Sequence, residues 1–444
     1  MDSYKQFFKD KKITVMGLGL LGRGLGYTKF LAECGADLIV TDLKTKKQLA
    51  TSLKQLGKYK NIKYVLGEHR LEDFKNREMI VKAAGVPFDS IYIKEAKKNN
   101  IPIEMDVSLF AKLAPQVIIV GVTGTRGKSM TAMLIYEILS KNLKDKKVYL
   151  GGNIRGVATL PLLEKAKPGD VLVCELDSWQ LQGFGDAKMS PHISIFTSFM
   201  PDHMNYYKNS MKDYFADKMN IFKYQKKNDF LIIRPHVEKL ISKKVKSKII
   251  VADVKKLVGF KFVVPGEHQR ENLACAFEVA RLFKIPIVKI KNTVKNFKGI
   301  EGRLQHLKTV RGIKIYNDNN ATTPEATIAG IKALYQDGKE GKIVLISGGA
   351  DKKLDLKLYV NVVNTFCKAI VLIPGSGTNV LLKDYKLKIP YVVGKDFKDA
   401  VLKGLDFTKK GDVLLFSPAF ASFGIFNNEY ERNDLFVKLI NKLK

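Results

Sequence analysis

An apolar run that passes directly into a glycine-rich turn is the strongest constraint on how this chain folds. The stretch VIIVGVTGTRGKSM begins at Val117, and its first four residues suit a strand buried on both faces of a parallel sheet. Ser129–Leu139 has the apolar spacing of a helix. The glycines between them, Gly121, Gly124 and Gly127, let backbone amides converge on an anion. The stretch therefore predicts a phosphate-binding loop between a central strand and a helix.

This loop departs from the strict P-loop pattern in two ways. A strict P-loop has four residues between its first glycine and its Gly-Lys pair. Here Val122 occupies the position of that first glycine, and the glycine itself, Gly121, comes one residue early. Lys128 supplies a charge for the β and γ phosphates, and the Ser129 hydroxyl can bind Mg²⁺. We therefore predict an ATP site. Arg126 stands inside the loop, where it either adds a charge beside phosphate or points into solvent.

The N-terminal region shows a related organisation. A β-branched run, Ile13–Met16, enters the glycine turn of GLGLLGRG, and after an apolar-periodic helix a second strand, Asp37–Thr41, ends at Asp42. Such a unit sets phosphate on a helix N-terminus and a carboxylate near a ribose or base. It predicts a nucleotide-type pocket. An NAD-binding dehydrogenase would show the same pattern, and close helix–strand packing alone could require the glycines.

Polar residues follow two later strands. The apolar run Val171–Cys174 ends at Glu175, and the strand in ISIFTSFMPDHMNYY leads to Asp202 and His203. A carboxylate at the tip of a strand beside a phosphate loop is where a further Mg²⁺ ligand is needed. His203 is as compatible with a metal or phosphate role as with an ordinary polar position.

Composition restricts the class of protein. A chain of 444 residues suits about three domains, and 45% hydrophobic residues with 14 prolines indicate ordered globular structure. The four cysteines lie far apart without metal-type spacing, which favours buried thiols in a reducing compartment. The N-terminus lacks a signal core, and no apolar run approaches the ~18 residues that cross a bilayer. We expect a cytoplasmic protein without a membrane partner.

The net charge of +32 raises the alternative of a nucleic-acid-binding protein with a nucleotide fold. Lysines outnumber arginines and are scattered along every segment, without a basic tail or interleaved aromatic residues. This distribution favours a solvated lysine-rich surface that also steers anionic substrates. We expect no nucleic-acid partner.

Taken together, the motifs resemble the Mur ligase family of peptidoglycan synthesis over nearly the whole chain. TGTRGKS is similar to the family's TGTNGKS, off-register glycine included, ELDSWQL to ELSSFQL, and DHMNYY to DHMDRY. The resemblance implies an α/β fold of three domains. These are a Rossmann-like UDP-binding domain at 1–100, a central P-loop ATPase-like domain with a parallel sheet at 101–301, and a C-terminal Rossmann-like domain at 302–444.

The resemblance implies ATP and two Mg²⁺ ions as cofactors. In the family, a lysine that becomes carbamylated corresponds to Lys218, which the residues alone would describe as a surface lysine. GEHQRENLACA, GIEGRLQHL and YNDNNATTPEAT add three positions near ATP to those of the loop. The implied nucleotide-binding residues are Gly124, Thr125, Gly127, Lys128, Ser129, Asn272, Arg303 and Asp318. The implied metal ligands are Ser129, Glu175 and His203, and the implied catalytic residues are Lys128, His203 and Lys218.

The resemblance also implies the substrates, through the branch of the family that adds D-glutamate. GLGLLGRG, VTDLK and GGNIRG look like parts that bind the UDP-sugar of UDP-N-acetylmuramoyl-L-alanine, whereas LISGGADKKLDL and FSPAFASFGIF look like parts that bind D-glutamate. The implied substrate-binding residues are Leu20, Leu21, Asp42, Asn153, Thr322, Lys352 and Ser422. We expect a monomeric, ADP-forming ligase that works through an acyl phosphate.

Three positions depart from the family's pattern in the amino-acid site. Asn320 replaces a usual lysine, while Glu429 and Asn433 replace a usual phenylalanine and glycine. A Mur-type ligase for another amino acid therefore stands as the alternative within the family.

Overall fold

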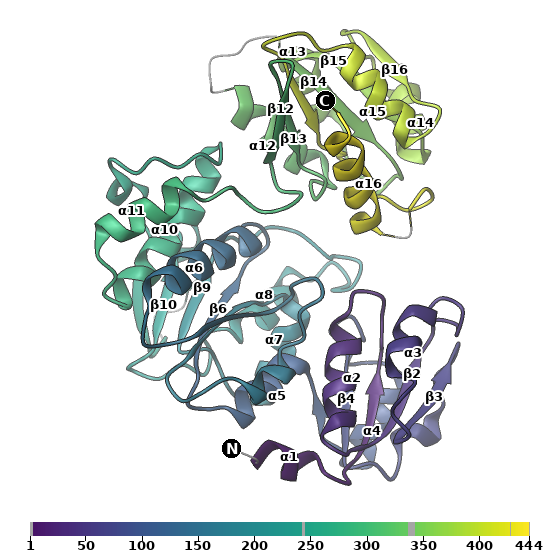
Figure 1. The fold of residues 1–444 in the computed structure, drawn as a ribbon, viewed down its shortest axis with the longest axis vertical. Helices are drawn as coiled ribbons and strands as arrows, with labels where there is room; N and C mark the ends of the chain where they lie inside the picture. Colours follow the sequence, from purple (N-terminus) through teal and green to yellow (C-terminus); the bar gives the residue numbers. More distant parts are fainter. Residues whose placement is uncertain (1–2, 242–244, 336–341, 427, 444) are drawn as a thin grey trace. The chain divides into compact units, whose positions relative to one another are not determined.

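The computed structural model describes residues 3–241, 245–335, 342–426 and 428–443, and the chain divides into two compact units (Figure 1). The first unit contains Met1–Val258 and Glu271–Thr293, and the second contains Gly259–Arg270 and Val294–Lys444. Two β-sheets belong to the first unit and one to the second. Helices accompany every sheet, which confirms the predicted α/β class.

The first sheet has five parallel strands in the order β3-β2-β1-β4-β5. Its strands are β1 (Lys12–Met16), β2 (Asp37–Asp42), β3 (Ile62–Leu66), β4 (Met79–Lys82) and β5 (Ile103–Glu104). Its helices are α1 (Ser3–Phe8), α2 (Arg23–Glu33), α3 (Ala50–Leu56), the 3₁₀ helix η1 (Leu71–Phe74) and α4 (Ile91–Lys98). The strand order reverses between β1 and β4, and ligands of open α/β sheets bind at the carboxyl ends of strands at such a point. The glycine turn after β1 lies there.

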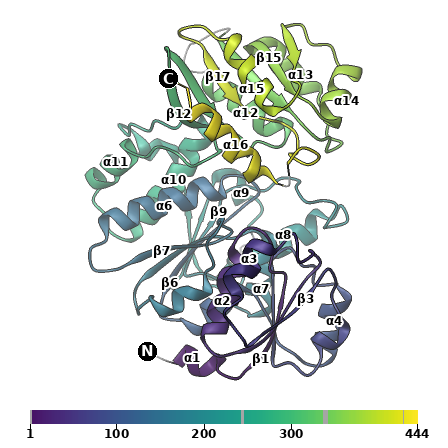
Figure 2. The ribbon, with the colours of Figure 1, turned by 45° about the vertical axis from the view of Figure 1, so that its right-hand side comes forward.

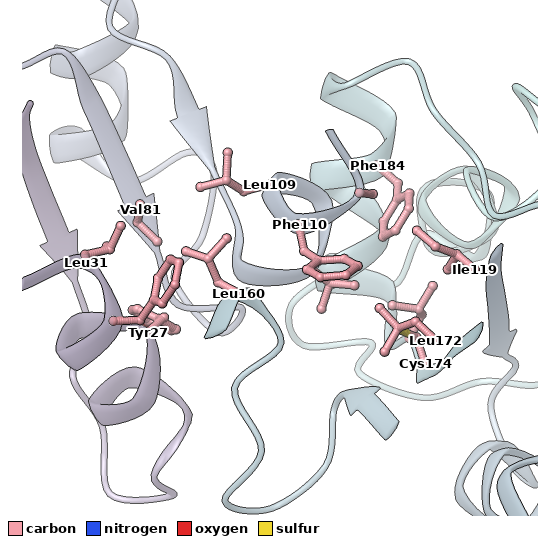
Figure 3. Packing of buried hydrophobic residues seen from close by; sticks show 14 of the residues in the cluster. Tyr27, Leu31, Val81, Leu109, Phe110, Ile119, Leu160, Leu172, Cys174 and Phe184 are labelled. Carbon is pink, nitrogen blue, oxygen red and sulfur yellow. The ribbon is translucent and has the colours of Figure 1, made fainter. Parts of the chain in front are cut away.

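Helix α5 (Asp106–Leu113) joins the cores of the two sheets in the first unit. Leu109 and Phe110 are almost fully buried, and Figure 3 shows them between Tyr27 and Val81 on one side and Ile119 on the other. The α5 residue Asp106 accepts hydrogen bonds from the backbone N–H groups of Thr159 and Leu160, at 2.8 and 2.7 Å. One continuous hydrophobic core therefore supports both the glycine turn after β1 and the central phosphate loop.

The second sheet has six parallel strands in the order β11-β10-β9-β6-β8-β7. Its strands are β6 (Ile118–Thr123), β7 (Val148–Gly152), β8 (Val171–Glu175), β9 (Ile193–Phe196), β10 (Phe230–Ile233) and β11 (Lys248–Val251). Helix α6 (Lys128–Asn142) packs against β6, β7 and β8 and runs along this sheet in both views (Figure 1, Figure 2). Because β6 lies between β8 and β9, the loop that follows it is flanked by the ends of both neighbouring strands.

Shorter elements complete this part of the chain: η2 (Leu160–Glu164), α7 (Ser178–Asp186), α8 (Met211–Met219), α9 (Pro235–Glu238) and η3 (Val254–Leu257). Two further helices, α10 (Glu267–Leu282) and α11 (Ile287–Lys295), each contain residues of both units.

The third sheet, in the second unit, has the order β12-β13-β17-β14-β15-β16, in which only β12 is antiparallel to its neighbour. Its strands are β12 (Gln305–Val310), β13 (Ile313–Asn317), β14 (Ile343–Gly348), β15 (Cys367–Ile373), β16 (Tyr391–Val393) and β17 (Val413–Phe416). Its helices are α12 (Pro324–Tyr335), α13 (Lys357–Phe366), α14 (Ser376–Asp384), α15 (Phe397–Asp406) and α16 (Glu429–Asn441).

Helices cover both faces of this third sheet. Successive side chains of a strand point to opposite faces, so a single strand contributes to two cores. In β14, Ile343 and Leu345 belong to a core shared with α12 and α13, whereas Val344 and Ile346 belong to a second core shared with α15 and α16. The continuous apolar run of β14 in the sequence therefore reflects burial on two sides.

The expectations drawn from composition agree with the structure where it tests them. All four cysteines are buried and unpaired, and burial raises the pKa of Cys275 to about 11 and that of Cys34 to about 12. These thiols are packed core groups and not reactive nucleophiles. In the part of the chain that the structure describes, no helix is both long and apolar enough to cross a bilayer.

Candidate functional site

The predicted phosphate loop connects β6 to α6, and its backbone requires glycine at two positions. Gly124 has φ 141° and Gly127 has φ 90°, a region that residues with a side chain rarely adopt. A Cβ atom on Gly124 would collide with the Thr197 hydroxyl, and one on Gly127 would collide with Asn272. Both backbone conformation and close packing therefore exclude larger residues.

Gly121 does not belong to this loop. It lies inside β6, where a Cβ atom would stand 2.6 Å from Pro191 Cγ and 3.0 Å from Leu176 Cδ1. The prediction that Gly121 helps the amides converge on an anion is wrong. Tight packing under the sheet requires this glycine, so its offset from the strict P-loop pattern carries no information about the nucleotide.

The segment after β9 holds the phosphate loop in shape. Ser198 accepts hydrogen bonds from two loop amides, through its carbonyl from Thr125 N–H and through its hydroxyl from Arg126 N–H, both at 2.8 Å. The Thr197 hydroxyl donates to the Arg126 carbonyl at 2.6 Å. Because these bonds form within the protein, the loop has its curved shape without any ligand.

Two lysine ammonium groups meet at one carbonyl of this loop. Lys128 Nζ, at the start of α6, donates to Gly124 O at 3.0 Å and to Thr125 O at 3.1 Å. Lys218 Nζ, from α8, donates to the same Gly124 O at 3.0 Å. The Lys218 side chain is only 1% exposed, so its description as a surface lysine from the residues alone is wrong. Only the family resemblance pointed to it.

This arrangement changes the acid–base behaviour of Lys218. Burial lowers the pKa of Lys218 well below its ordinary value, and the neighbouring charge of Lys128 lowers it further, against the opposing effect of Asp177, Asp202 and Asp217. A buried ammonium group beside a second cation is disfavoured. Lys218 therefore has an unusually large neutral fraction at neutral pH, and a neutral amine is nucleophilic.

His203 lies close to the same two lysines. Its ring is 4.8 Å from that of Trp179, and its backbone has φ 55°, which is uncommon for a residue with a side chain. Burial lowers the pKa of His203 below 6.5, Asp202 opposes this, and the charges of Lys128 and Lys218 lower it further. A neutral imidazole is the form that can bind a metal ion.

Arg126 has a partner that the sequence did not reveal. Its Nη1 atom lies 2.9 Å from Asp202 Oδ2, and the two side chains are 46% and 25% exposed. Both interpretations of Arg126, phosphate contact and solvent exposure, omitted this ion pair. The pair joins the phosphate loop to the residue that precedes His203.

Glu175 lies at the carboxyl end of β8, paired in register with Val122 of β6, and it is buried. Asn153 N–H donates to the Glu175 carbonyl at 2.7 Å, and the Asn153 side-chain amide reaches Glu175 Oε1 at 3.5 Å. The structure thus brings together a predicted metal ligand and a predicted UDP-sugar contact.

The loop that contains Asn153 also touches the glycine turn of the first sheet. Gly156 N–H donates to the Leu21 carbonyl at 2.9 Å, and a Cβ atom on Gly22 would lie 3.2 Å from Gly156 Cα. Leu20 is 48% exposed. Asp42 is buried, and its two oxygens accept hydrogen bonds from Gly19 N–H and Lys44 N–H, each at 2.8 Å. The four predicted UDP-sugar residues therefore lie on the loops that follow β1 and β7 and at the carboxyl end of β2.

Two predicted ATP contacts lie in different units. Asn272, in the first unit, is buried and accepts hydrogen bonds from Thr131 Oγ1 and Arg234, beside Gly127. Asp318, in the second unit, accepts hydrogen bonds from Leu304 N–H and Ser417 Oγ, both at 2.9 Å. Burial raises the pKa of Asp318 to about 7. Their contacts with ATP stay predictions.

A cavity of about 260 Å³ in the second unit collects most of the residues predicted for the amino-acid site. Lys352 Nζ donates to Thr322 Oγ1 at 2.9 Å on its wall. The cavity also contains two of the three residues that depart from the family pattern. Its lining consists of Arg303, Asn320, Thr322, Lys352, Ala421, Ser422, Phe423, Glu429 and Tyr430.

Arg432 is a buried structural residue, close in sequence to the cavity residues Glu429 and Tyr430, that sequence reasoning missed. It is 1% exposed, and it donates from Nε to Asn319 Oδ1 at 2.9 Å and from Nη2 to the Asn319 carbonyl at 3.0 Å. Asn433 has a related role, because its amide accepts from Asn317 at 2.8 Å and donates to Glu301 at 2.7 Å. These bonds attach α16 to the loop after β13. No local pattern in the sequence indicated these contacts.

The residues predicted to bind Mg²⁺ provide a hydroxyl from the start of α6, a carboxylate from the end of β8 and an imidazole from the segment after β9. No group of three or more His, Cys, Asp or Glu that could hold a metal ion occurs in residues 3–241, 245–335, 342–426 and 428–443. Oxygen ligands from Ser129 and Glu175 suit Mg²⁺, which usually keeps several waters or phosphate oxygens and needs few protein ligands. The donor set therefore fits this ion when phosphate oxygens complete it.

Comparison with known protein families gives matches in three successive parts of the chain. Residues 11–104 match the domain family described as "Mur ligase MurD-like, N-terminal domain", residues 122–259 match "Mur ligase middle domain", and residues 302–420 match "Mur ligase, glutamate ligase domain". Three domains occur in the predicted order, which confirms the three-domain α/β fold.

A relative from Borreliella afzelii, named UDP-N-acetylmuramoylalanine--D-glutamate ligase, is 38% identical, and the match covers 98% of both chains. Among solved structures, the UDP-N-acetylmuramate-alanine ligase MurC of Thermotoga maritima has a TM-score of 0.63 at 18% identity, covering 97% of this chain and 99% of its own. The MurF ligase of Thermotoga maritima in complex with ADP has a TM-score of 0.58 at 16% identity, covering 99% and 97%. At these identities the structures support the fold alone.

The Arg126–Asp202 pair predicts a small effect of Arg126→Asn. An exposed ion pair contributes less than about 1 kcal/mol, so the dissociation constant for ATP should change less than about fivefold. Calorimetric titration with ATP and a thermal unfolding scan measure both effects, with Arg126→Lys as the variant that keeps the charge. A much larger loss of ATP affinity in Arg126→Asn, absent in Arg126→Lys, would show that the guanidinium charge contacts phosphate.

Proposed function

The chain belongs to the Mur ligase family, and we propose that it joins D-glutamate to UDP-N-acetylmuramoyl-L-alanine while ATP is converted to ADP and phosphate. The observation that carries this choice of amino acid is the cavity that brings Arg303, Thr322, Lys352 and Ser422 together. Its residues Arg303, Thr322 and Lys352 lie in the part of the chain that matches the glutamate ligase domain, residues 302–420, and the Borreliella relative has the corresponding name. The reaction serves the synthesis of peptidoglycan precursors.

The first step must activate a carboxylate, because hydroxide is a poor leaving group for amide formation in water. The γ-phosphoryl group of ATP passes to the terminal carboxylate of UDP-N-acetylmuramoyl-L-alanine and leaves an acyl phosphate and ADP. The amine of D-glutamate then attacks the acyl carbon, and phosphate leaves as the amide forms. Two anions must approach in the first step, so the main task of the protein is electrostatic.

The phosphate loop performs the first part of this task. Gly124, Thr125, Gly127 and Ser129 surround the phosphates, and Lys128 places its ammonium group at the mouth of the loop. The same ammonium group donates to two loop carbonyls, and phosphate oxygens would offer it stronger, charge-assisted hydrogen bonds. Asn272, Arg303 and Asp318 complete the ATP contacts in this proposal.

Ser129, Glu175 and His203 would hold Mg²⁺, of which two ions are proposed. When bound, Mg²⁺ neutralises the negative charge that develops during phosphoryl transfer. The buried Glu175 carboxylate comes from β8 and the neutral His203 imidazole from the segment after β9, so both lie beside the loop after β6. The lowered pKa of His203 favours its neutral imidazole, in which one ring nitrogen has a free lone pair for a metal ion.

Lys218 joins this site as a carbamate. Its neutral amine attacks the carbon of CO₂, and one amine proton is released to solvent as the carbamate anion forms. The product is a carboxylate-like group that can help hold Mg²⁺, and it removes the unfavourable pair of cations at Gly124 O. The lowered pKa of Lys218 supports this step because it increases the reactive neutral fraction at neutral pH.

The substrates divide between the two units. Leu20, Leu21, Asp42 and Asn153 contact the UDP-sugar from the loops after β1 and β7 and from the end of β2. The first three belong to the UDP-binding domain at 1–100, and Asn153 belongs to the ATP-binding domain at 101–301. Thr322, Lys352 and Ser422 bind D-glutamate in the domain at 302–444. Lys352 supplies a charge for a carboxylate, and the two hydroxyls supply hydrogen bonds. The enzyme acts as a monomer in the cytoplasm.

A second candidate is a ligase for another amino acid, which the presence of Asn320 and Glu429 in the cavity favours. Phosphate release with UDP-N-acetylmuramoyl-L-alanine, ATP and one amino acid at a time separates the two. We expect D-glutamate to exceed L-glutamate, L-lysine and diaminopimelate by about a hundredfold in kcat/KM. Preference for another of these would reject D-glutamate as the substrate and leave the ligase class intact.

Lys128→Ala should lower kcat/KM for ADP formation by about a thousandfold, because it removes a positive charge aimed at the developing charge of the transition state. Affinity for the UDP-substrate should not change. Lys141→Ala is the matched control, since Lys141 lies in the last turn of the same helix and pairs with Glu137. Unchanged ADP formation in Lys128→Ala, dependent on both other substrates, would falsify the assigned role of the loop.

Lys218→Ala should lose at least about a hundredfold in kcat, and acetate should restore part of it by supplying a carboxylate in the space that the side chain leaves. Wild-type activity should fall as pH falls from neutral, because protonation of the amine and loss of CO₂ both remove the carbamate. Lys212→Ala, an exposed position on the same helix, is the control. A wild-type protein whose intact mass never includes CO₂ at neutral pH, together with no rescue by acetate, would exclude the carbamate.

A further inference from the structure

We propose that the Glu429 carboxylate binds the amino group of the incoming amino acid. This inference rests on the proposed function and extends it, because it assigns a contact to the third charged group of the amino acid. Glu429 is one of the residues that line the 260 Å³ cavity, together with Lys352 and Arg303. It would act as a substrate-binding residue that sets both the position of the amine and the selection of the amino acid.

The backbone of Glu429 is held at the wall of this cavity. Glu429 is the first residue of α16, and its carbonyl accepts a hydrogen bond from Asn319 Nδ2 at 3.0 Å. The preceding residue, Asn428, caps the helix by accepting from Tyr430 N–H and Glu431 N–H, each at 3.0 Å. One turn later on α16, Arg432 also binds Asn319, so this asparagine contacts the helix at two positions. These contacts determine where the Glu429 side chain begins.

The Glu429 carboxylate itself has no hydrogen-bonding or ion-pair partner in residues 3–241, 245–335, 342–426 and 428–443. Arg432, on the same helix, interacts electrostatically with Glu429, but its N–H groups are directed to Asn319 and the Phe420 carbonyl. Lys352 already donates to Thr322. An acid in a cavity beside two basic residues, yet paired with neither, is available to a ligand.

The charges of the cavity complement one class of ligand. Its lining has two cationic groups, Arg303 and Lys352, and one anionic group, Glu429, while its other residues are neutral. An acidic amino acid with two carboxylates and one ammonium group has the opposite set. Like-charge contacts at an interface are strongly disfavoured and opposite charges decide which ligand is accepted. A pocket with cations alone would suit a dicarboxylate but would repel the ammonium group.

Three charged contacts also distinguish the two mirror forms of the amino acid. Two contacts to the carboxylates of glutamate fix both ends of the ligand. If the Glu429 carboxylate is placed to meet the amino group of the D form, the amino group of the L form then points away from it. Loss of the Glu429 charge should therefore weaken the discrimination between D- and L-glutamate. A residue that only stabilises α16 would leave this ratio unchanged.

The simpler interpretation is that an acid in the first turn of α16 only interacts favourably with the helix dipole. Glu431 lies in the same turn, is exposed and does not line the cavity. Glu431→Gln therefore removes the same helix-dipole contribution as Glu429→Gln without changing the cavity. The two variants form a matched pair, and Glu429→Asp keeps the charge on a shorter side chain.

The experiment measures KM for D-glutamate, ATP and UDP-N-acetylmuramoyl-L-alanine by phosphate release, and inhibition by glutarate, which is glutamate without its amino group. In Glu429→Gln, KM for D-glutamate should rise at least about tenfold, as expected for loss of a charge-assisted hydrogen bond. The other two KM values and the glutarate inhibition constant should change less than about twofold. Glu431→Gln should match the wild type, and Glu429→Asp should lie between Glu429→Gln and the wild type.

The outcomes distinguish a failure of the Glu429 role from a failure of the proposed function. A wild-type protein that uses D-glutamate, with a Glu429→Gln variant that keeps its KM and D/L ratio, overturns the role of Glu429 and leaves the proposed function standing. Equal weakening of glutarate and D-glutamate also overturns it, because the amino group would not be the contact. If the wild type uses another amino acid, the proposed substrate fails, and the same comparison with that amino acid and its analogue without the amine still decides the role of Glu429.

Discussion

Two lysine ammonium groups that share one backbone carbonyl are the interaction on which the catalytic half of this protein depends. Lys128 and Lys218 both donate to Gly124 O, and Gly124 has a backbone conformation that only glycine adopts readily. Burial lowers the pKa of Lys218 and of His203, and repulsion from the neighbouring lysine charges lowers both further. The site is therefore arranged for anions, and phosphates together with a carbamate would satisfy it in the proposed reaction.

In the proposed reaction the second unit has a different task, which is to recognise a small zwitterion with excess negative charge. Its cavity combines Arg303 and Lys352 with a single acid, Glu429. Buried Arg432 binds Asn319, the residue before the cavity residue Asn320, and burial lowers the pKa of this guanidinium to about 10. A buried guanidinium is tolerated where carbonyl and amide oxygens surround it. The charged lining thus rests on a polar layer that is satisfied within the protein.

Sequence reasoning succeeded where local pattern and structure have the same cause. The strand before the phosphate loop, the helix after it and Glu175 at the end of its strand all occur as predicted. It failed where distant residues decide: Gly121 serves packing against Pro191, and Arg126 pairs with Asp202, 76 residues later. No local pattern contains such partners, since they meet only when the ends of β6 and β9 are neighbours.

By itself, the sequence determined the α/β class, the glycine-rich loop, the acids after the strands and, through its motifs, the family. These follow from periodicity and from glycine conformations, which act over a few residues. Only the tertiary structure decided that Lys218 is buried, that it shares a carbonyl with Lys128, and that Glu429 faces the same cavity as Lys352. The physical reason is that burial, pKa and charge complementarity depend on which surfaces meet, and residues far apart in the chain create those surfaces.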